Sequence, residues 1–177
     1  MNTTKNLPRL AAVIAVALLA LTGCTPESTP TESTSRPAGE TVTIEDAWVK
    51  SADEGMSAGF GTLVNSGADD VTVVSVASEA SSMLELHETV ENEAGEMVMR
   101  EKDGGFIIPA GGSLVLEPGA NHIMMMDLTG PLAAGSDVTF TLTFSDDSTY
   151  EFTAPVKDYS GANENYEGGE MQDGSGQ

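Results

Sequence analysis

The feature that most constrains this chain is an alternation of apolar and polar residues in several short segments. Successive side chains of a β-strand point to opposite faces, so a period of two is typical of strands that bury one face. Turn-forming residues such as Asn65-Ser66-Gly67 and Pro118-Gly119 separate the segments. No stretch has the period of a convincing amphipathic helix. The pattern predicts strands at residues 41–50, 71–78, 137–145 and 148–154.

Many short strands separated by turns predict an all-β domain, built as a sandwich or a Greek-key barrel. We expect the folded domain at residues 41–157, because the flanking residues 24–40 and 158–177 have little apolar surface to bury. Trp48 lies an even number of residues from Val42 and Ile44. A regular strand would therefore place Trp48 in the core with them.

The first 23 residues have the organisation of a cleaved leader. Lys5 and Arg9 precede an apolar run at residues 11–21, which is shorter than the roughly 20 residues that span a bilayer as a helix. The run ends in Leu21-Thr22-Gly23-Cys24, which resembles the bacterial lipobox, whose cysteine is lipidated and becomes the mature N-terminus. Residues 1–23 are therefore predicted to be a lipoprotein signal peptide. Cys24 is predicted to anchor the protein to the extracytoplasmic face of the cell membrane.

Two segments flank the predicted domain. Residues 24–40 are rich in Ser, Thr, Pro and Glu, which predicts a flexible tether, and residues 158–177 are expected to be an acidic disordered tail. The chain has 28 acidic and 7 basic residues, a net charge of −21, and so acidic a surface argues against a nucleic-acid partner. The one cysteine is the predicted anchor, so the domain has neither a disulfide nor a thiolate ligand.

Methionine is concentrated in the middle of the chain. Six of the nine methionines fall between positions 83 and 126, together with both histidines. Strand alternation places the side chains of each of three groups on one face: His122, Met124 and Met126; Met83, Glu85 and His87; Met97 and Met99. Neighbouring strands could then bring two imidazoles and two thioethers together. That ligand set is soft and neutral, and it suits Cu(I) better than hard cations.

Methionine also fills irregular cores without binding a metal. We favour that role for Met83, Met97 and Met125, and Met126 is open between filler and ligand. The competing hypothesis for the whole cluster is a metal-free β-sandwich lipoprotein for adhesion or interaction, with the methionines as a hydrophobic docking patch. That hypothesis predicts no dependence on metal.

The spacing of these residues resembles the signature of periplasmic copper chaperones of the PCu(A)C type: a histidine, a later methionine, and then a His-x-Met pair. Here Met99 follows His87 by 12 residues, and His122 follows Met99 by 23 residues and precedes Met124. The resemblance covers residues 45–157, with matching segments at Ala47-Trp48-Val49-Lys50, Gly55-Met56-Ser57-Ala58-Gly59, Ile108-Pro109-Ala110-Gly111-Gly112 and Gly130-Pro131-Leu132.

The resemblance implies a cupredoxin-like β-barrel that binds one Cu(I) through four ligands and passes it to a partner. The implied ligands are His87, Met99, His122 and Met124. The implied acceptors are the copper A centre of cytochrome c oxidase subunit II, or a Sco-type thiol protein. We expect no enzymatic activity. Electron transfer through a blue-copper site is also not expected, since that site needs a cysteine ligand in the domain.

The chain departs from the family signature at two places. The first gap is one residue longer than usual, so Met97, on the same face, is an alternative to Met99. Thr89 stands where many members carry a methionine. Met97 is therefore an additional candidate ligand, and so is Met126, which shares a face with His122 and Met124.

Overall fold

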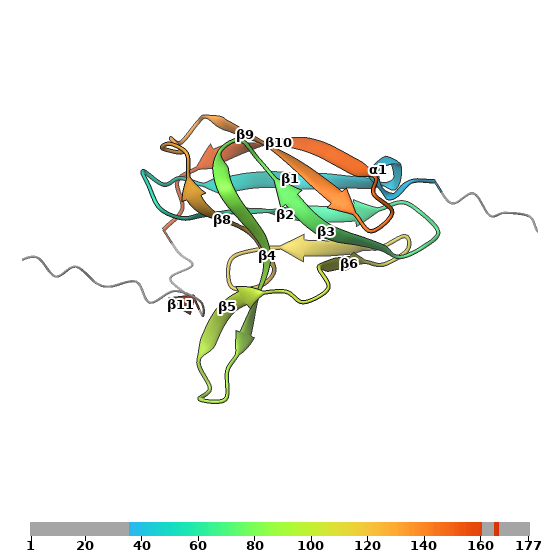
Figure 1. Ribbon diagram of the computed structural model, residues 1–177, viewed down its shortest axis with the longest axis horizontal. Helices are drawn as coiled ribbons and strands as arrows, with labels where there is room; N and C mark the ends of the chain where they lie inside the picture. Colours follow the sequence, from blue (N-terminus) through green and yellow to red (C-terminus); the bar gives the residue numbers. More distant parts are fainter. Residues whose placement is uncertain (1–35, 161–164, 167–177) are drawn as a thin grey trace, which may run out of the picture. The chain divides into compact units, whose positions relative to one another are not determined.

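The computed structural model describes residues 36–160 and 165–166 (Figure 1). The predicted signal peptide, Cys24, and most of the predicted tether and tail lie outside the described residues. The described part contains one short helix and eleven strands: α1 Ala38–Thr41, β1 Val42–Lys50, β2 Ser57–Asn65, β3 Val71–Ala77, β4 Ser81–Glu91, β5 Met97–Glu101, β6 Phe106–Ile108, β7 Ser113–Leu116, β8 His122–Leu128, β9 Asp137–Phe144, β10 Thr149–Lys157 and β11 Asn165–Tyr166. The all-β prediction is confirmed, and each of the four predicted strands corresponds to an observed one.

The strands form a hydrogen-bonded path in the order β11-β5-β4-β8-β2-β1-β10-β9-β3-β6, and β7 pairs with β2 beside it. β10 is parallel to β1 and antiparallel to β9. It therefore joins the part of the sheet that runs from β11 to β1 to the part that runs from β9 to β6. Side chains from both parts form one hydrophobic core, which includes Ile123 and Met125 of β8 and Phe140 and Phe144 of β9. The opposite face of β8 is therefore left for other chemistry.

An irregularity in β1 changes the position of Trp48. The pairing of β1 with β2 shifts register between Glu45 and Trp48, and Asp46 has a φ of 52°. A bulge of this kind reverses the faces of the residues that follow. Val49 is therefore the buried residue, whereas Trp48 is half-buried outside the core and packs on Phe60, with ring centroids 4.5 Å apart. The prediction that Trp48 belongs to the core was wrong.

The helix α1 packs on the domain just before β1. Asp146 Oδ2 accepts a hydrogen bond from the backbone N–H of Ala38 at 2.8 Å, and Ser148 Oγ accepts one from Gly39 N–H at 2.9 Å. Ala38 is buried in the core. These contacts hold residues that the sequence assigns to the tether. Among the described residues, no helix has the length and hydropathy needed to cross a membrane.

Candidate metal centre

The pairing of β4 with β8 brings the predicted histidines together. His87 lies directly opposite His122, Glu85 opposite Met124, and Met83 opposite Met126. Directly opposed residues point to the same face of a sheet, so these side chains share the face that points away from Ile123 and Met125. The two histidine rings meet edge to face, with centroids 5.6 Å apart.

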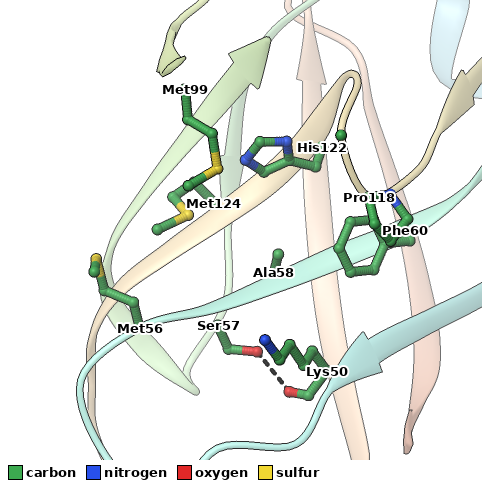
Figure 2. Close-up of a pocket in the computed structure, with 10 residues that line it drawn as sticks. Lys50, Met56, Ser57, Ala58, Phe60, Met99, Pro118, His122 and Met124 are labelled. Atoms are coloured by element: carbon green, nitrogen blue, oxygen red, sulfur yellow. Dashed lines mark hydrogen bonds between the residues drawn. The ribbon is translucent and has the colours of Figure 1, made fainter. Parts of the chain in front are cut away.

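The pairing of β4 with β5 distinguishes the two candidate methionines of β5. Met99 lies opposite Thr89, whereas Met97 lies opposite Glu91 at the outer end of the hairpin. Met99 lines a cavity of about 170 Å³ that His122 and Met124 also line. Figure 2 shows the side chains of Met99, Met124 and His122 pointing toward one another. Met97 is 49% exposed and does not line this cavity.

The ring of His122 has one nitrogen available for a metal. Its Nδ1 lies 3.0 Å from the carbonyl oxygen of Ala120, and because a carbonyl can only accept, Nδ1 carries the hydrogen and donates it. In the neutral ring, Nε2 then carries the lone pair. Nε2 is buried and has no hydrogen-bond partner among the described residues. A buried, unsatisfied acceptor in a cavity lined by thioethers fits a soft metal ion.

Burial also keeps His122 in the form that a metal requires. Burial lowers the pKa of His122 below its usual value, and the neighbouring His87 lowers it further, while the hydrogen bond to Ala120 opposes the change. Only the neutral imidazole can bind a metal. The site therefore favours the ligating form at neutral pH.

His87 lies next to His122, on the neighbouring strand β4, and is fully buried. Its Nε2 lies 2.8 Å from Oε2 of Glu85, two residues earlier on the same face of β4. A carboxylate beside an imidazole orients the ring and fixes its tautomer. Although β4 brings His87 into contact with His122, the cavity in Figure 2 is lined by His122 and not by His87.

The other acidic residues of β4 are not equivalent to Glu85. Glu88 forms ion pairs with Arg100 at 2.9 Å and with Lys102 at 2.5 Å. The hydrogen bond from Lys102 lowers the pKa of Glu88 most, and Arg100 contributes further. Because two cations surround Glu88, this carboxylate adds little net negative charge to the field at the cavity. Glu85 is the carboxylate that contacts a candidate ligand.

Two residues of the site were not singled out as functional by the sequence. Met56 and Phe60 line the cavity from the side of β2, next to Met124 and His122. Both lie in or beside a segment that matched the family resemblance, but Met56 precedes β2 and belongs to no alternating pattern. Only the pairing of β2 with β8, which is set by Ser57 opposite Met125, places Met56 on this face.

Comparisons with known proteins show which family the chain belongs to. Residues 42–156 match the family model described as "Putative lipoprotein LpqE-like". The chain is 46% identical over 168 residues to "Putative lipoprotein Lxx21020" of Leifsonia xyli subsp. xyli, covering 95% of this chain and 100% of that protein.

Two solved structures resemble the domain. One is the apo PCuAC domain from PmoF1, with a TM-score of 0.58 and 19% identity over 71% of this chain and 99% of that one. The other is the solution structure of CuI-DR1885 from Deinococcus radiodurans, with a TM-score of 0.52 and 25% identity over 72% of this chain and 83% of that one. The first likeness shows the fold alone, and at that level it confirms the predicted resemblance to PCu(A)C domains.

Proposed function

The chain belongs to the LpqE-like family, and we propose that this protein is a lipid-anchored, extracytoplasmic chaperone that binds Cu(I) and passes it to an acceptor protein. The observation that carries the proposal is the buried Nε2 of His122, which lacks a hydrogen-bond partner among the described residues and lies on a cavity shared with the thioethers of Met99 and Met124. The similarity to CuI-DR1885, which was solved in its Cu(I) form, supports the same metal.

The proposed ligands are His87, Met99, His122 and Met124. Met99 is chosen over Met97 because Met99 lines the cavity, whereas Met97 is exposed at the end of the hairpin. All four ligands are neutral, so Cu(I) keeps its charge in the site, and the nearby carboxylate of Glu85 compensates that charge. Copper here is the cargo of the protein.

A neutral site that opens on a surface cavity suits transfer, because the thiolates of an acceptor can replace thioethers one at a time. We propose that the acceptor is cytochrome c oxidase subunit II, with its copper A centre, or a Sco-type thiol protein. Lipidation of Cys24 would hold the chaperone at the same membrane surface as such an acceptor. The segment after Cys24 would act as a tether. In the predicted acidic tail, β11 pairs with β5 and therefore lies beside the strand that carries Met99.

The proposal is tested by titrating the full chain in detergent with Cu(I) in competition with a chelator. The double variant His122→Ala, Met124→Ala removes two proposed ligands, and it should bind Cu(I) more than about 100-fold more weakly than the wild type. Loss of a residue that only supports a ligand usually weakens binding by about 10-fold to 100-fold, so a larger loss identifies the ligands themselves. Thermal unfolding monitors the fold of the variant. Equal binding by both proteins would overturn the site, and no binding by either would favour the metal-free docking protein.

A further inference from the structure

The side chains on the candidate copper face lie in successive rows across three neighbouring strands. The first row pairs His87 with His122, and the second pairs Glu85 with Met124, which is itself opposite Ala58 of β2. The third row pairs Met83 with Met126. Ser81 fixes that pair, because its hydroxyl donates to the backbone oxygens of both Met83 and Met126.

Met56 extends the third row on the side of β2. Ser57 pairs with Met125, and the N–H of Leu128 donates to the carbonyl oxygen of Gly55 at 3.2 Å. Met56 lies between these two contacts, and this position is beside Met126. Met56 also lines the cavity with Met124, and Figure 2 shows it on the far side of Met124 from His122. Three methionines from adjacent segments thus occupy one row.

The three methionines of this row differ in how far solvent can reach them. Met125, on the other face of β8, belongs to the main core cluster, whereas Met126 is buried outside that cluster and Met56 and Met83 are half-buried or exposed. Met126 is 8% exposed and Met83 is 46% exposed. The row therefore runs from a covered thioether to thioethers that solvent can reach. A filler methionine has no need of such an arrangement, whereas a soft cation arriving from solvent or from a partner could use it.

We propose that Met56, Met83 and Met126 form a second Cu(I) site, which adjoins the site of the two histidines because Met56 also lines the cavity of that site. Three thioethers are neutral, soft donors that suit Cu(I), and they need no deprotonation to bind. The site lacks imidazole ligands and is open to solvent at Met83, so it binds Cu(I) more weakly than the first site.

The position of this methionine row suggests how it is used. Met124 lies two residues from His122 and two from Met126 on the same face of β8. Cu(I) can pass along that face by exchange of one neutral ligand for another, with no change in oxidation state. The role of the row as an uptake or release step rests on the proposed chaperone function, whereas the binding of Cu(I) by the row does not.

The test is a titration of the full chain, labelled with ¹³C on the methionine methyl groups and held in detergent, with Ag(I) as a redox-inert probe for Cu(I). The signals are assigned by single Met→Leu variants. The methyl signals of Met99 and Met124 should shift with the first equivalent, and those of Met56, Met83 and Met126 should shift together with the second. The proposal is overturned if the three signals stay in place, or if the second equivalent shifts only Met97 or Met171.

A variant pair separates this proposal from the chaperone proposal. The double variant Met83→Leu, Met126→Leu should bind one equivalent of Cu(I) fewer than the wild type and keep the affinity of the first equivalent. Met97→Leu, which changes a methionine of similar exposure, should keep both equivalents. If the methyl signals of Met99 and Met124 do not shift in the wild type while those of Met56, Met83 and Met126 do, the proposed chaperone site is wrong and the second site is supported. If the double variant retains both equivalents, the row fails and the chaperone site stands.

Discussion

His87 and Glu85 are joined by a hydrogen bond of 2.8 Å between Nε2 and Oε2, and the imidazole is fully buried while the carboxylate stays partly exposed. Glu85 also lies directly opposite Met124. One carboxylate therefore touches a proposed ligand on its own strand and faces another on the next strand. In the proposed site, this arrangement would let Glu85 balance the charge of Cu(I).

Replacing Glu85 by Leu should weaken Cu(I) binding by about 10-fold to 100-fold, as loss of an outer-shell partner of a ligating histidine usually does. Glu85→Gln keeps an oxygen that can accept from Nε2 but loses the charge, so its effect should be smaller. Chelator competition measures both affinities. Identical affinities for the wild type and Glu85→Leu would show that the carboxylate does not support the ligand. Glu91→Leu, which changes an exposed carboxylate at the far end of β4, serves as the matched control.

Substitution of the two methionines of β5 should have unequal effects. Met99→Leu removes the thioether that lines the cavity with His122 and Met124, so Cu(I) affinity should fall by at least about tenfold. Met97→Leu changes an exposed side chain outside the cavity, so affinity should stay unchanged. Leucine keeps a similar volume and apolar character, so both variants should fold as the wild type does. The reverse order of effects would assign the ligand to Met97.

The sequence predicted β1, β3, β9 and β10 because each has a clear alternation, and it predicted the shared face of His122 and Met124 for the same reason. It could not choose between Met97 and Met99, since both have the same parity and only the pairing with Thr89 separates them. Trp48 was misplaced because the bulge after Glu45 cannot be read from alternation. Met56 reaches the site through the pairing of β2 with β8, which no local pattern encodes.

The helix α1 was missed for a different physical reason. Its four residues include a glycine and have no apolar period, so nothing local predicts a helix there. Its backbone N–H groups are held instead by Asp146 and Ser148, more than 100 residues later in the chain. Such a turn is stabilised by tertiary contacts, which form only when the β9–β10 hairpin is in place.

The contact between Asp146 and α1 should make stability depend on acid pH. Hydrogen bonds from the Ser148 side chain and then from Ala38 N–H lower the pKa of Asp146 below its usual value. A carboxyl whose pKa is lower in the folded state stabilises the fold above its unfolded pKa, and that contribution is lost as the pH falls below about 4. Urea unfolding of the wild type and Asp146→Asn should therefore differ at pH 7 and converge in acid. A constant difference across this range would contradict the assignment.

The paired glycines before β6 should respond differently to the same substitution. Gly104 and Gly105 both have a φ of 78°, so alanine at either position costs about 1–2 kcal/mol of backbone strain. A Cβ on Gly104 would have no heavy atom within 4 Å, whereas a Cβ on Gly105 would overlap the backbone carbonyl oxygen of Val73 on β3. Because that oxygen belongs to a paired strand, β6 must shift to relieve the overlap. Gly105→Ala should thus lower the free energy of unfolding well beyond the loss in Gly104→Ala, as measured by urea denaturation. Equal losses would mean that β6 moves freely away from β3.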